Sequence, residues 1–240
     1  MPVLEGRRIL LTGAGSGIGK ATAMLFAEEG AKVALLDIDK DSVSYASDLG
    51  GVALSADVRD EQAVTTAMRA AAEEFGGLDG LVNAAGIGMN ADLEDLDMDL
   101  WRRVIDINLT GTYVVCRAAL PFLRQAGDGT IVNVASGAAT RNGKGRSAYI
   151  ASKAGVIAFT RGIASELAPD IRVNAILPGA VETPLLQGMM ANQEAREALE
   201  SRYALKRVGQ PIEIANAILF MTSKQSSFMT GSPMVVDGGQ

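Results

Sequence analysis

Short apolar runs recur along the chain, separated by longer segments whose apolar residues repeat with helical spacing. The runs cover residues 8–12, 32–37, 52–56, 78–83, 129–135, 171–177 and 233–236. Several are apolar at consecutive positions, such as Ile9, Leu10 and Leu11, which is typical of parallel strands covered by helices on both faces. The alternation predicts an α/β fold in which right-handed crossovers build a doubly wound parallel sheet of about seven strands.

The segment 61–75 illustrates the helical spacing. Its apolar residues fall on one face of a helix: Val64, Ala67, Met68 and Ala71. Gly76 and Gly77 follow and are expected to end the helix.

Residues 182–207 fit the alternation less well, because they follow Pro178-Gly179, contain Gly188 and are rich in Leu and Met. We expect either a mobile helical lid over a site at the carboxyl edge of the sheet or a packed extra pair of helices. No repeat, low-complexity tract or Pro- and Ser-rich linker marks a boundary, so residues 1–240 are expected to form a single domain.

Composition excludes several classes of protein. The chain has no histidine and one cysteine, Cys116, which removes Ser-His-Asp and Cys-His nucleophiles, histidine-containing zinc sites and intrachain disulfides. Cys116 lies in an apolar stretch and is expected to be a buried thiol. The net charge of -6 argues against nucleic acid as a partner. No stretch approaches the roughly 20 apolar residues of a membrane span and no signal peptide is recognisable, so we expect a cytoplasmic protein.

A glycine-rich turn follows the first run and opens the first helix. Without Cβ atoms the turn can approach a pyrophosphate, which the free N–H groups and dipole of the helix N-terminus stabilise. The spacing Gly-x3-Gly-x-Gly is a variant of the dinucleotide fingerprint, although such a turn can also be merely structural. The residues predicted to contact the dinucleotide here are Gly13, Ser16, Gly17, Ile18 and Gly19.

Asp37 ends the second run about 20 residues past the glycines, where a carboxylate can accept hydrogen bonds from adenosine ribose hydroxyls. The same charge repels a 2′-phosphate, and no Arg or Lys stands within the glycine turn or directly after Asp37. The sequence therefore predicts NAD rather than NADP as the cofactor. Alternatively, Asp37 caps the segment that follows it, which leaves the choice of cofactor open.

Tyr149 and Lys153 stand four residues apart at the start of a predicted helix, so their side chains share one face. A phenol is a poor base at neutral pH. A cation about 4 Å away favours the phenolate form by about 4 kcal/mol at an effective dielectric of about 20. The pair therefore predicts a tyrosine that transfers a proton.

In their order and spacing, the motifs resemble the short-chain dehydrogenase/reductase family across essentially the whole chain. The matching segments are Thr12-Gly13-x3-Gly17-Ile18-Gly19, Asp57-Val58, Asn83-Ala84-Ala85-Gly86, Asn108, Ser136, Tyr149-x3-Lys153 and Pro178-Gly179 with Thr183. The resemblance implies a Rossmann-type fold and reversible hydride transfer between a secondary alcohol and NAD⁺ that gives a ketone and requires no metal.

The resemblance also implies catalytic roles for Asn108, Ser136, Tyr149 and Lys153. Tyr149 is the expected general acid/base, and Ser136 is the expected hydrogen-bond partner of the substrate oxygen. Lys153 would support the phenolate and hold the nicotinamide ribose. Asn108 would support a proton-relay water, or serve only as a structural hydrogen-bonding residue in its helix.

Further cofactor contacts follow from the same resemblance. Asp57 and Val58 would border the adenine, although Asp57 could equally cap the next helix. Thr183 and the backbone near Val181 would hold the nicotinamide carboxamide. The remaining expected contacts are Asn83, Ala84, Ala85, Gly86, Tyr149, Lys153, Pro178 and Gly179, with Asn83 to Gly86 closer to scaffold than to chemistry.

Three cations follow Ser136 in a loop that borders the substrate in the family, where a more apolar version is usual. We hypothesise that Arg141, or else Lys144 or Arg146, faces a polar or anionic substrate such as a hydroxy acid or sugar derivative. The alternative is a solvated loop whose charges point outward. The substrate contacts predicted from the sequence are Ala138, Arg141, Arg146 and Leu185.

Three functions remain open from the sequence: an NAD-dependent alcohol, polyol or hydroxy-acid dehydrogenase, a 3-oxoacyl-carrier-protein reductase, and a non-catalytic nucleotide-binding protein. The usual NADPH preference of the second conflicts with Asp37, and the four catalytic residues argue against the third. The resemblance also suggests a homotetramer, in which helices around residues 101–123 and 152–167 pair across one two-fold axis and residues 235–240 could line another interface.

Overall fold

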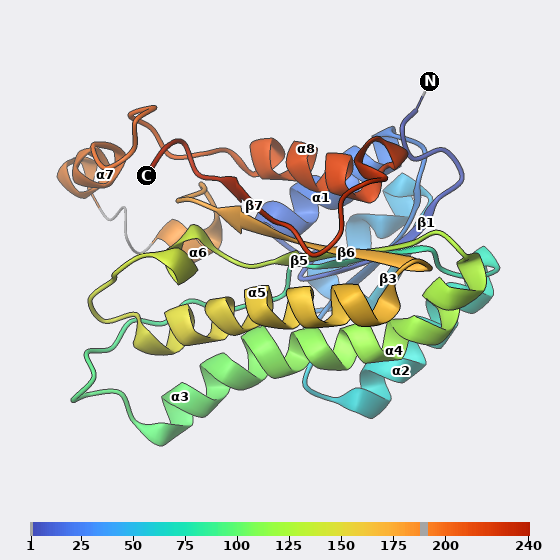
Figure 1. The fold of residues 1–240 in the computed structure, drawn as a ribbon, viewed down its shortest axis with the longest axis horizontal. Helices are drawn as coiled ribbons and strands as arrows, with labels where there is room; N and C mark the ends of the chain where they lie inside the picture. The colour runs from blue at the N-terminus through green and yellow to red at the C-terminus, as the bar shows by residue number, and fades with distance from the viewer. Residues whose placement is uncertain (1, 188–191) are drawn as a thin grey trace.

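The computed structural model describes residues 2–187 and 192–240, and its centre is a parallel β-sheet (Figure 1). Within these residues, seven strands lie in the order β3-β2-β1-β4-β5-β6-β7. Their bounds are β1 Arg8–Thr12, β2 Lys32–Asp37, β3 Val52–Ser55, β4 Gly80–Asn83, β5 Gly129–Val134, β6 Ile171–Pro178 and β7 Pro233–Val236. The predicted doubly wound α/β sheet is confirmed.

Helices cover both faces of the sheet, with α1 and α8 on one face and α2, α4 and α5 on the other (Figure 1). A π-helical turn, Asp106–Thr110, joins α3 to α4. In the described ranges, no helix combines the length and apolarity needed to cross a membrane. The helix bounds are α1 Gly17–Glu28, α2 Glu61–Phe75, α3 Met98–Ile105, α4 Gly111–Ala126, α5 Ser147–Leu167, α6 Pro184–Gln187, α7 Gln193–Glu200 and α8 Pro211–Thr222.

Alternate residues of each central strand enter two different cores. In β1, Ile9 and Leu11 are buried in the core that contains α1 and α8, whereas Leu10 is buried in the core that contains α2 and α4. Because successive side chains of a strand point to opposite faces, a strand covered on both sides is apolar at consecutive positions. The consecutive apolar residues that predicted the sheet therefore reflect its burial on two sides.

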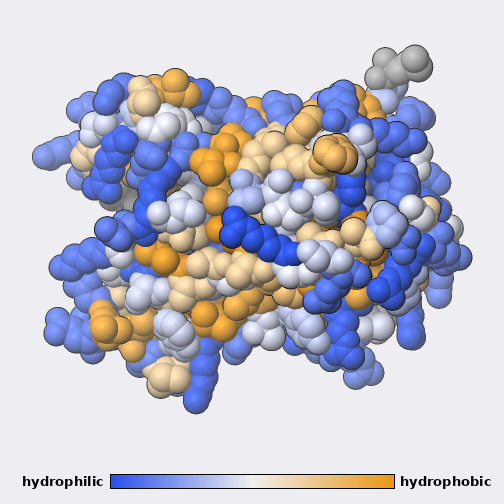
Figure 2. All heavy atoms as spheres, in the orientation of Figure 1, coloured by the Kyte–Doolittle hydropathy of each residue, from blue (hydrophilic) through white to orange (hydrophobic). Residues whose placement is uncertain are grey.

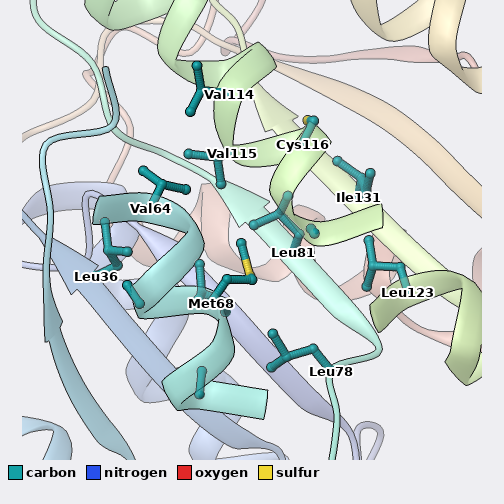
Figure 3. Packing of buried hydrophobic residues seen from close by; sticks show 14 of the residues in the cluster. Leu36, Val64, Met68, Leu78, Leu81, Val114, Val115, Cys116, Leu123 and Ile131 are labelled. Carbon is teal, nitrogen blue, oxygen red and sulfur yellow. The ribbon is translucent and has the colours of Figure 1, made fainter. Parts of the chain in front are cut away.

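Helix α2 has the predicted bounds and the predicted buried face. Val64, Met68 and Ala71 are fully buried, and Met68 lies next to Leu81 of β4 in the core (Figure 3). Gly76 adopts a left-handed backbone with φ of 74° and ends the helix, a conformation that glycine reaches without a steric penalty.

The N-terminal cap of α2 differs from the one considered from the sequence. Asp60, rather than Asp57, is the N-cap residue, and its Oδ1 accepts hydrogen bonds from the backbone N–H groups of Gln62 and Ala63 at 3.0 and 2.9 Å. A carboxylate in this position satisfies two of the N–H groups that the first turn leaves without a helical partner.

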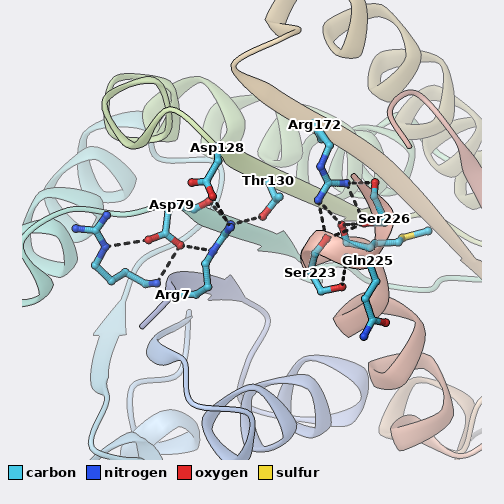
Figure 4. A network of polar contacts seen from close by, with 10 residues as sticks. Arg7, Asp79, Asp128, Thr130, Arg172, Ser223, Gln225 and Ser226 are labelled. Carbon is cyan, nitrogen blue, oxygen red and sulfur yellow. Dashed lines mark hydrogen bonds and ion pairs between the residues drawn. The ribbon is translucent and has the colours of Figure 1, made fainter. Parts of the chain in front are cut away.

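A polar network fastens the amino-terminal edge of the sheet (Figure 4). The buried Asp79 pairs with Arg7 at 2.7 Å and with Arg8 at 2.9 Å. On the same edge, Arg172 of β6 donates to the backbone carbonyls of Ser226 and Ser223, beyond the end of α8. These contacts hold elements together at one edge of the sheet and leave the loops at the opposite, carboxyl edge available for a site.

The expected lid contains the two short helices α6 and α7. Leu186, Leu199, Tyr203 and Val208 bury one another in a small cluster separate from the two main cores. The described part of the segment therefore packs as extra helices, which was one of the two arrangements expected. Residues 188–191, which include Gly188, Met189 and Met190 of the expected lid, lie outside the described residues, and movement of the lid stays a prediction.

Candidate active site

The carboxyl ends of the strands meet at the left-hand edge of the molecule in Figure 1, next to α6 and the start of α5. Parallel strands place their last residues along one edge, and ligands of doubly wound sheets bind there. Figure 2 shows that the surface is hollowed at this edge. The residues predicted to bind cofactor and substrate lie at or after the ends of the first six strands, β1 to β6.

The glycine turn between β1 and α1 fits a pyrophosphate. Gly13 has φ of 63° and lies so close to the end of β4 that a Cβ atom would be 2.6 Å from the nitrogen of Ala85. Ser16 is the N-cap residue of α1, but its side chain makes no capping hydrogen bond, and the first turn contains no acidic residue. Among the residues that the structure describes, the N–H groups that open α1 have no side-chain partner, so they suit an anion.

Asp37 lies beside this turn, at the end of β2. Its Oδ2 accepts a hydrogen bond from the N–H of Gly15 at 3.0 Å. The helical segment after β2 begins at Asp41 with Lys40 as its N-cap residue, so Asp37 does not cap it. The carboxylate therefore faces the glycine turn, as a residue that contacts the adenosine ribose must do.

Two residues near Asp37 were not singled out from the sequence. The Tyr45 hydroxyl donates to the carbonyl of Ala14 in the glycine turn at 2.7 Å, and the Lys20 Nζ lies 4.8 Å from the centroid of the Tyr45 ring. Burial and the nearby Asp37 charge raise the pKa of Tyr45 to about 12, so the phenol stays neutral. Lys20 immediately follows Gly19, and that position was the signal available in the sequence.

Asp57 and Val58 follow β3. A hydrogen bond from the Arg59 guanidinium lowers the pKa of Asp57, which keeps this carboxylate ionised at the expected adenine end of the site. The two side chains also form an ion pair at 2.5 Å. Val58 is buried and would be 2.6 Å from a Cβ atom on Gly111, so α4 begins close against it.

The residues at the end of β4 are scaffold, as expected for Asn83. Its Nδ2 donates to Asn133 Oδ1 at 2.9 Å, and Asn133 Nδ2 donates to Thr160 Oγ1 at 2.9 Å, which ties β4 and β5 to α5. The Asn83 amide also donates to the sulfur of Cys116 at 3.2 Å. Burial raises the pKa of the Cys116 thiol to about 12, so Cys116 is the buried, unreactive thiol that its sequence context predicted.

Gly86 is the point where two predicted catalytic residues meet. A Cβ atom at Gly86 would be 3.1 Å from Asn108 Oδ1 and 3.2 Å from Lys153 Nζ. Asn108 is fully buried in the π-helical turn between α3 and α4, a geometry common at functional sites. Its Oδ1 accepts from the N–H of Ile87, and its Nδ2 donates to the Ile87 carbonyl and to Ser152 Oγ. These bonds are those of a structural hydrogen-bonding residue, one of the two roles expected for Asn108. Its role in supporting a proton-relay water stays a prediction.

Lys153 is a buried ammonium. Its Nζ donates to the carbonyl of Val134, the last residue of β5, at 2.8 Å. Burial lowers the pKa of Lys153 to about 8, because transfer from water penalises the charged form. The side chain is therefore cationic at neutral pH and loses its charge as the pH rises past that value.

Tyr149 lies one turn before Lys153 on α5, and 6% of its surface is exposed. It belongs to a small apolar cluster with Val104 and Ala148, against which Trp101 and Ala138 pack. The guanidinium carbon of Arg146 lies 4.8 Å from the centroid of the Tyr149 ring, a cation–π contact that sequence reasoning did not foresee. This packing fixes the orientation of the ring.

Ser136 follows β5, and its Oγ accepts a hydrogen bond from the N–H of Ala138 at 3.1 Å. Among the described residues, the hydroxyl proton of Ser136 has no acceptor, so it is free to donate to a substrate oxygen. Ala138, in the short helix Gly137–Thr140 after Ser136, packs against the apolar cluster that contains Tyr149.

The residues after β6 line the same edge. Pro178 ends the strand, and a Cβ atom at Gly179 would be 2.9 Å from the Cα of Asp237, so β6 and β7 end close together.

Thr183, after β6, donates to the Val181 carbonyl at 3.2 Å. Thr183 also faces the glycine turn, because its Cγ2 would be 3.0 Å from a Cβ atom on Gly17. Leu185, 52% exposed, lies against Gly88 in the loop after β4.

Two of the three cations in the loop after Ser136 have carboxylate partners. Arg141 pairs with Asp237 and also donates to the side chain of Gln240. Lys144 pairs with Asp92 at 3.2 Å. Arg141 is therefore held by the C-terminal segment.

Comparisons with known proteins indicate the family of the chain. A family model described as enoyl-(acyl carrier protein) reductase matches residues 13–240. The 3-oxoacyl-(acyl-carrier-protein) reductase of Thermotoga maritima is 41% identical, with 98% of this chain and 98% of the relative covered. The cis-4-hydroxycyclohexanecarboxylate dehydrogenase of Sinomonas cyclohexanicum is 44% identical, with 97% and 96% covered.

A solved structure gives the same result for the fold. The short-chain dehydrogenase/reductase from Brucella melitensis, described as a glucose/ribitol dehydrogenase, has a TM-score of 0.93 at 37% identity, with 99% of this chain and 97% of that chain covered. The chain belongs to the short-chain dehydrogenase/reductase family. The relatives differ in the substrates that their names give, so family membership alone does not identify the substrate.

Proposed function

We propose that this protein is an NAD(H)-dependent oxidoreductase that interconverts a secondary alcohol and a ketone, with Tyr149 as the general acid/base. The observation that carries the proposal is that Lys153 Nζ and Asn108 Oδ1 both approach Gly86. Lys153 lies one helical turn after Tyr149 on α5. Hydroxycyclohexanecarboxylate dehydrogenase, the named activity of one relative, is an alcohol oxidation of this class.

In this mechanism the side chains position the alcohol and move one proton. Ser136 Oγ donates a hydrogen bond to the substrate oxygen, while Tyr149 Oη takes the hydroxyl proton during oxidation and returns it during reduction. The Lys153 ammonium stabilises the phenolate, because opposite charges attract strongly in a site that excludes water. A bound nicotinamide supplies the hydride acceptor or donor, and the turn at Gly13 and the start of α1 would hold its pyrophosphate.

Asp37 supports NAD as the cofactor. Its carboxylate is held toward the glycine turn by Gly15, where its charge would oppose a 2′-phosphate. Lys20 supplies a cation near Tyr45, so the choice between NAD and NADP depends on whether the adenosine ribose contacts Asp37 or Lys20. Asp37 hydrogen-bonds to the turn itself, whereas Lys20 contacts the ring of Tyr45.

We also propose that residues 1–240 form one domain, in which residues 182–207 cover the substrate. The protein is further proposed to assemble as a homotetramer. Two exposed apolar side chains support an interface near β7: Phe228 is fully exposed and Val235 is 54% exposed. Light scattering tests the assembly, and a monomer at micromolar concentration would contradict it. A cytoplasmic location stays a prediction from the sequence.

A second candidate is reduction of 3-oxoacyl thioesters on a carrier protein, which the name of the Thermotoga maritima relative favours. This activity uses the same proton transfer at Tyr149 but a much longer, carrier-bound substrate.

A panel of alcohols, polyols, hydroxy acids and 3-oxoacyl thioesters, each assayed with NAD(H) and NADP(H), tests the proposal. We expect turnover of a secondary alcohol with NAD⁺ and a loss of about 100- to 10,000-fold in kcat with Tyr149→Phe, since general acid/base catalysis contributes this much. Turnover only of acyl thioesters with NADPH would favour the second candidate. Unchanged rates with Tyr149→Phe would remove the mechanism.

A further inference from the structure

The three cations after Ser136 look equivalent in the sequence, but the structure separates them by their partners. Arg141 is paired with Asp237, and Lys144 is paired with Asp92. In the described part of the chain, the guanidinium of Arg146 has no carboxylate or hydrogen-bond partner. Arg146 is therefore the cation of this loop whose charge is available to a ligand.

Arg146 also lies beside the residue proposed to transfer the proton. Its guanidinium carbon is 4.8 Å from the centroid of the Tyr149 ring. The N–H donors of a guanidinium can bind a carboxylate through two parallel hydrogen bonds. The cation–π contact holds Arg146 beside Tyr149, and no other described residue accepts a hydrogen bond from its donors.

The surroundings of Lys144 are different. It lines a hollow of the surface together with Asp92 and Glu94, so two negative charges offset its own. The net negative charge of this hollow would repel an anion, so Lys144 is a poor candidate for binding an anionic substrate.

We propose that Arg146 binds the carboxylate of an anionic substrate, a hydroxy acid or the corresponding keto acid, while its alcohol or ketone carbon reacts at Tyr149. The inference rests on the proposed function, because it assigns the substrate class of the same site. A hydroxy acid carries its carboxylate a few carbon atoms from the reacting carbon, and a substrate of this size can reach Tyr149 and Arg146 together.

The test compares hydroxy acids with their carboxamides, which have nearly the same shape and no charge. The wild-type enzyme should favour the acid over the amide by about 10- to 100-fold in kcat/KM, as expected for a charge-assisted, two-point contact. Arg146→Met should abolish this preference and Arg146→Lys should keep part of it. Lys144→Met is the matched control, because it removes a cation of the same loop that is paired with Asp92.

The outcomes separate the inference from the proposed function. Turnover of the amides without preference for the acids would overturn the inference and leave the proposed function in place. An equal fall of kcat/KM for acid and amide with Arg146→Met would also overturn it, because Arg146 would then only orient the Tyr149 ring. Failure of the wild type to turn over any alcohol or ketone with either nicotinamide would remove the proposed function and the inference with it.

Discussion

The ammonium of Lys153 donates to the carbonyl of Val134 at 2.8 Å, with the side chain almost completely withdrawn from water. One hydrogen bond offsets only part of the cost of burying a charge. Burial accordingly lowers the pKa of Lys153 to about 8. The residue that the proposed chemistry needs is therefore one that destabilises the folded protein.

Replacement of Lys153 should separate stability from activity. Lys153→Met should abolish turnover while raising the free energy of unfolding at pH 7 by about 1 to 3 kcal/mol, because a buried charge is removed. Between the folded pKa of about 8 and the unfolded value of about 10.4, the unfolded wild type binds more protons than the folded one. The free energy of unfolding of the wild type should therefore rise relative to that of the variant as the pH rises through this window, so the difference between them should narrow.

Urea unfolding of both proteins from pH 7 to pH 10 measures this difference. The use of a difference removes the contributions of the other titrating groups. A gap between the two proteins that stays constant, or widens as the pH rises, would contradict the burial of a charged Lys153.

Gly86 should tolerate no side chain, because Asn108 and Lys153 both approach it. A Cβ atom would be 3.1 Å from Asn108 Oδ1 and 3.2 Å from Lys153 Nζ, so Gly86→Ala should displace one or both. We expect kcat to fall about 10- to 100-fold, the scale on which small misplacements of reacting groups act.

Gly162→Ala is the matched control for this prediction. Gly162 lies on α5, and its added Cβ would meet nothing within 4 Å. The alanine should leave kcat unchanged and stabilise the helix by about 0.5 to 1 kcal/mol. Equal kinetics for Gly86→Ala and the wild type would show that Asn108 and Lys153 do not need their present positions.

Asp37 should determine the choice of cofactor through its charge. Asp37→Ser removes the carboxylate that Gly15 holds toward the turn and leaves Lys20 in place. The ratio of kcat/KM for NADP⁺ to that for NAD⁺ should rise about 10- to 100-fold, since a like charge no longer opposes the 2′-phosphate. Asp39→Ser is the control, because Asp39 is exposed and its carboxylate accepts from the backbone of Asp41. A wild type that already prefers NADP⁺ would refute the assignment.

Local sequence signals predicted the parts of this structure that depend on local interactions. The helix 61–75, its buried face and its end at Gly76 follow from spacing and from the backbone freedom of glycine. Strand positions follow from consecutive apolar residues, since burial on both faces requires them. Family resemblance, rather than spacing alone, brought Ser136 and Asn108 into the predicted site.

What the sequence could not predict are the contacts between distant segments. Arg141 and Arg146 look equivalent in the sequence, but Asp237, which pairs with Arg141, lies 96 residues later in the chain. The cap of α2 is a local exception, because Asp57 was considered from the sequence and Asp60 is the N-cap residue in the structure. Partners that are distant in sequence leave no periodic signal near the residue itself.

Arg141 and Asp237 should act as a structural pair whose loss affects all substrates alike. Burial favours a raised pKa for Asp237, but hydrogen bonds from the Gly239 backbone and Arg141 outweigh it and lower the pKa. The carboxylate is therefore ionised at neutral pH, and its pair with Arg141 joins the loop after Ser136 to the end of β7. Arg141→Met and Asp237→Asn should each lower kcat/KM several-fold for hydroxy acids and for their carboxamides, and the double variant should lose little more than either single one.

A thermodynamic cycle over these two substitutions measures the pair directly. Because the folded pKa of Asp237 is depressed, the stability that it contributes is present above the unfolded carboxyl pKa and is lost as the pH falls through the folded value. The stability difference between the wild type and Asp237→Asn should therefore shrink on acidification below about pH 4. Additive effects in the double variant would contradict a structural pair. A loss with Arg141→Met confined to anionic substrates would indicate that Arg141, rather than Arg146, binds the substrate carboxylate.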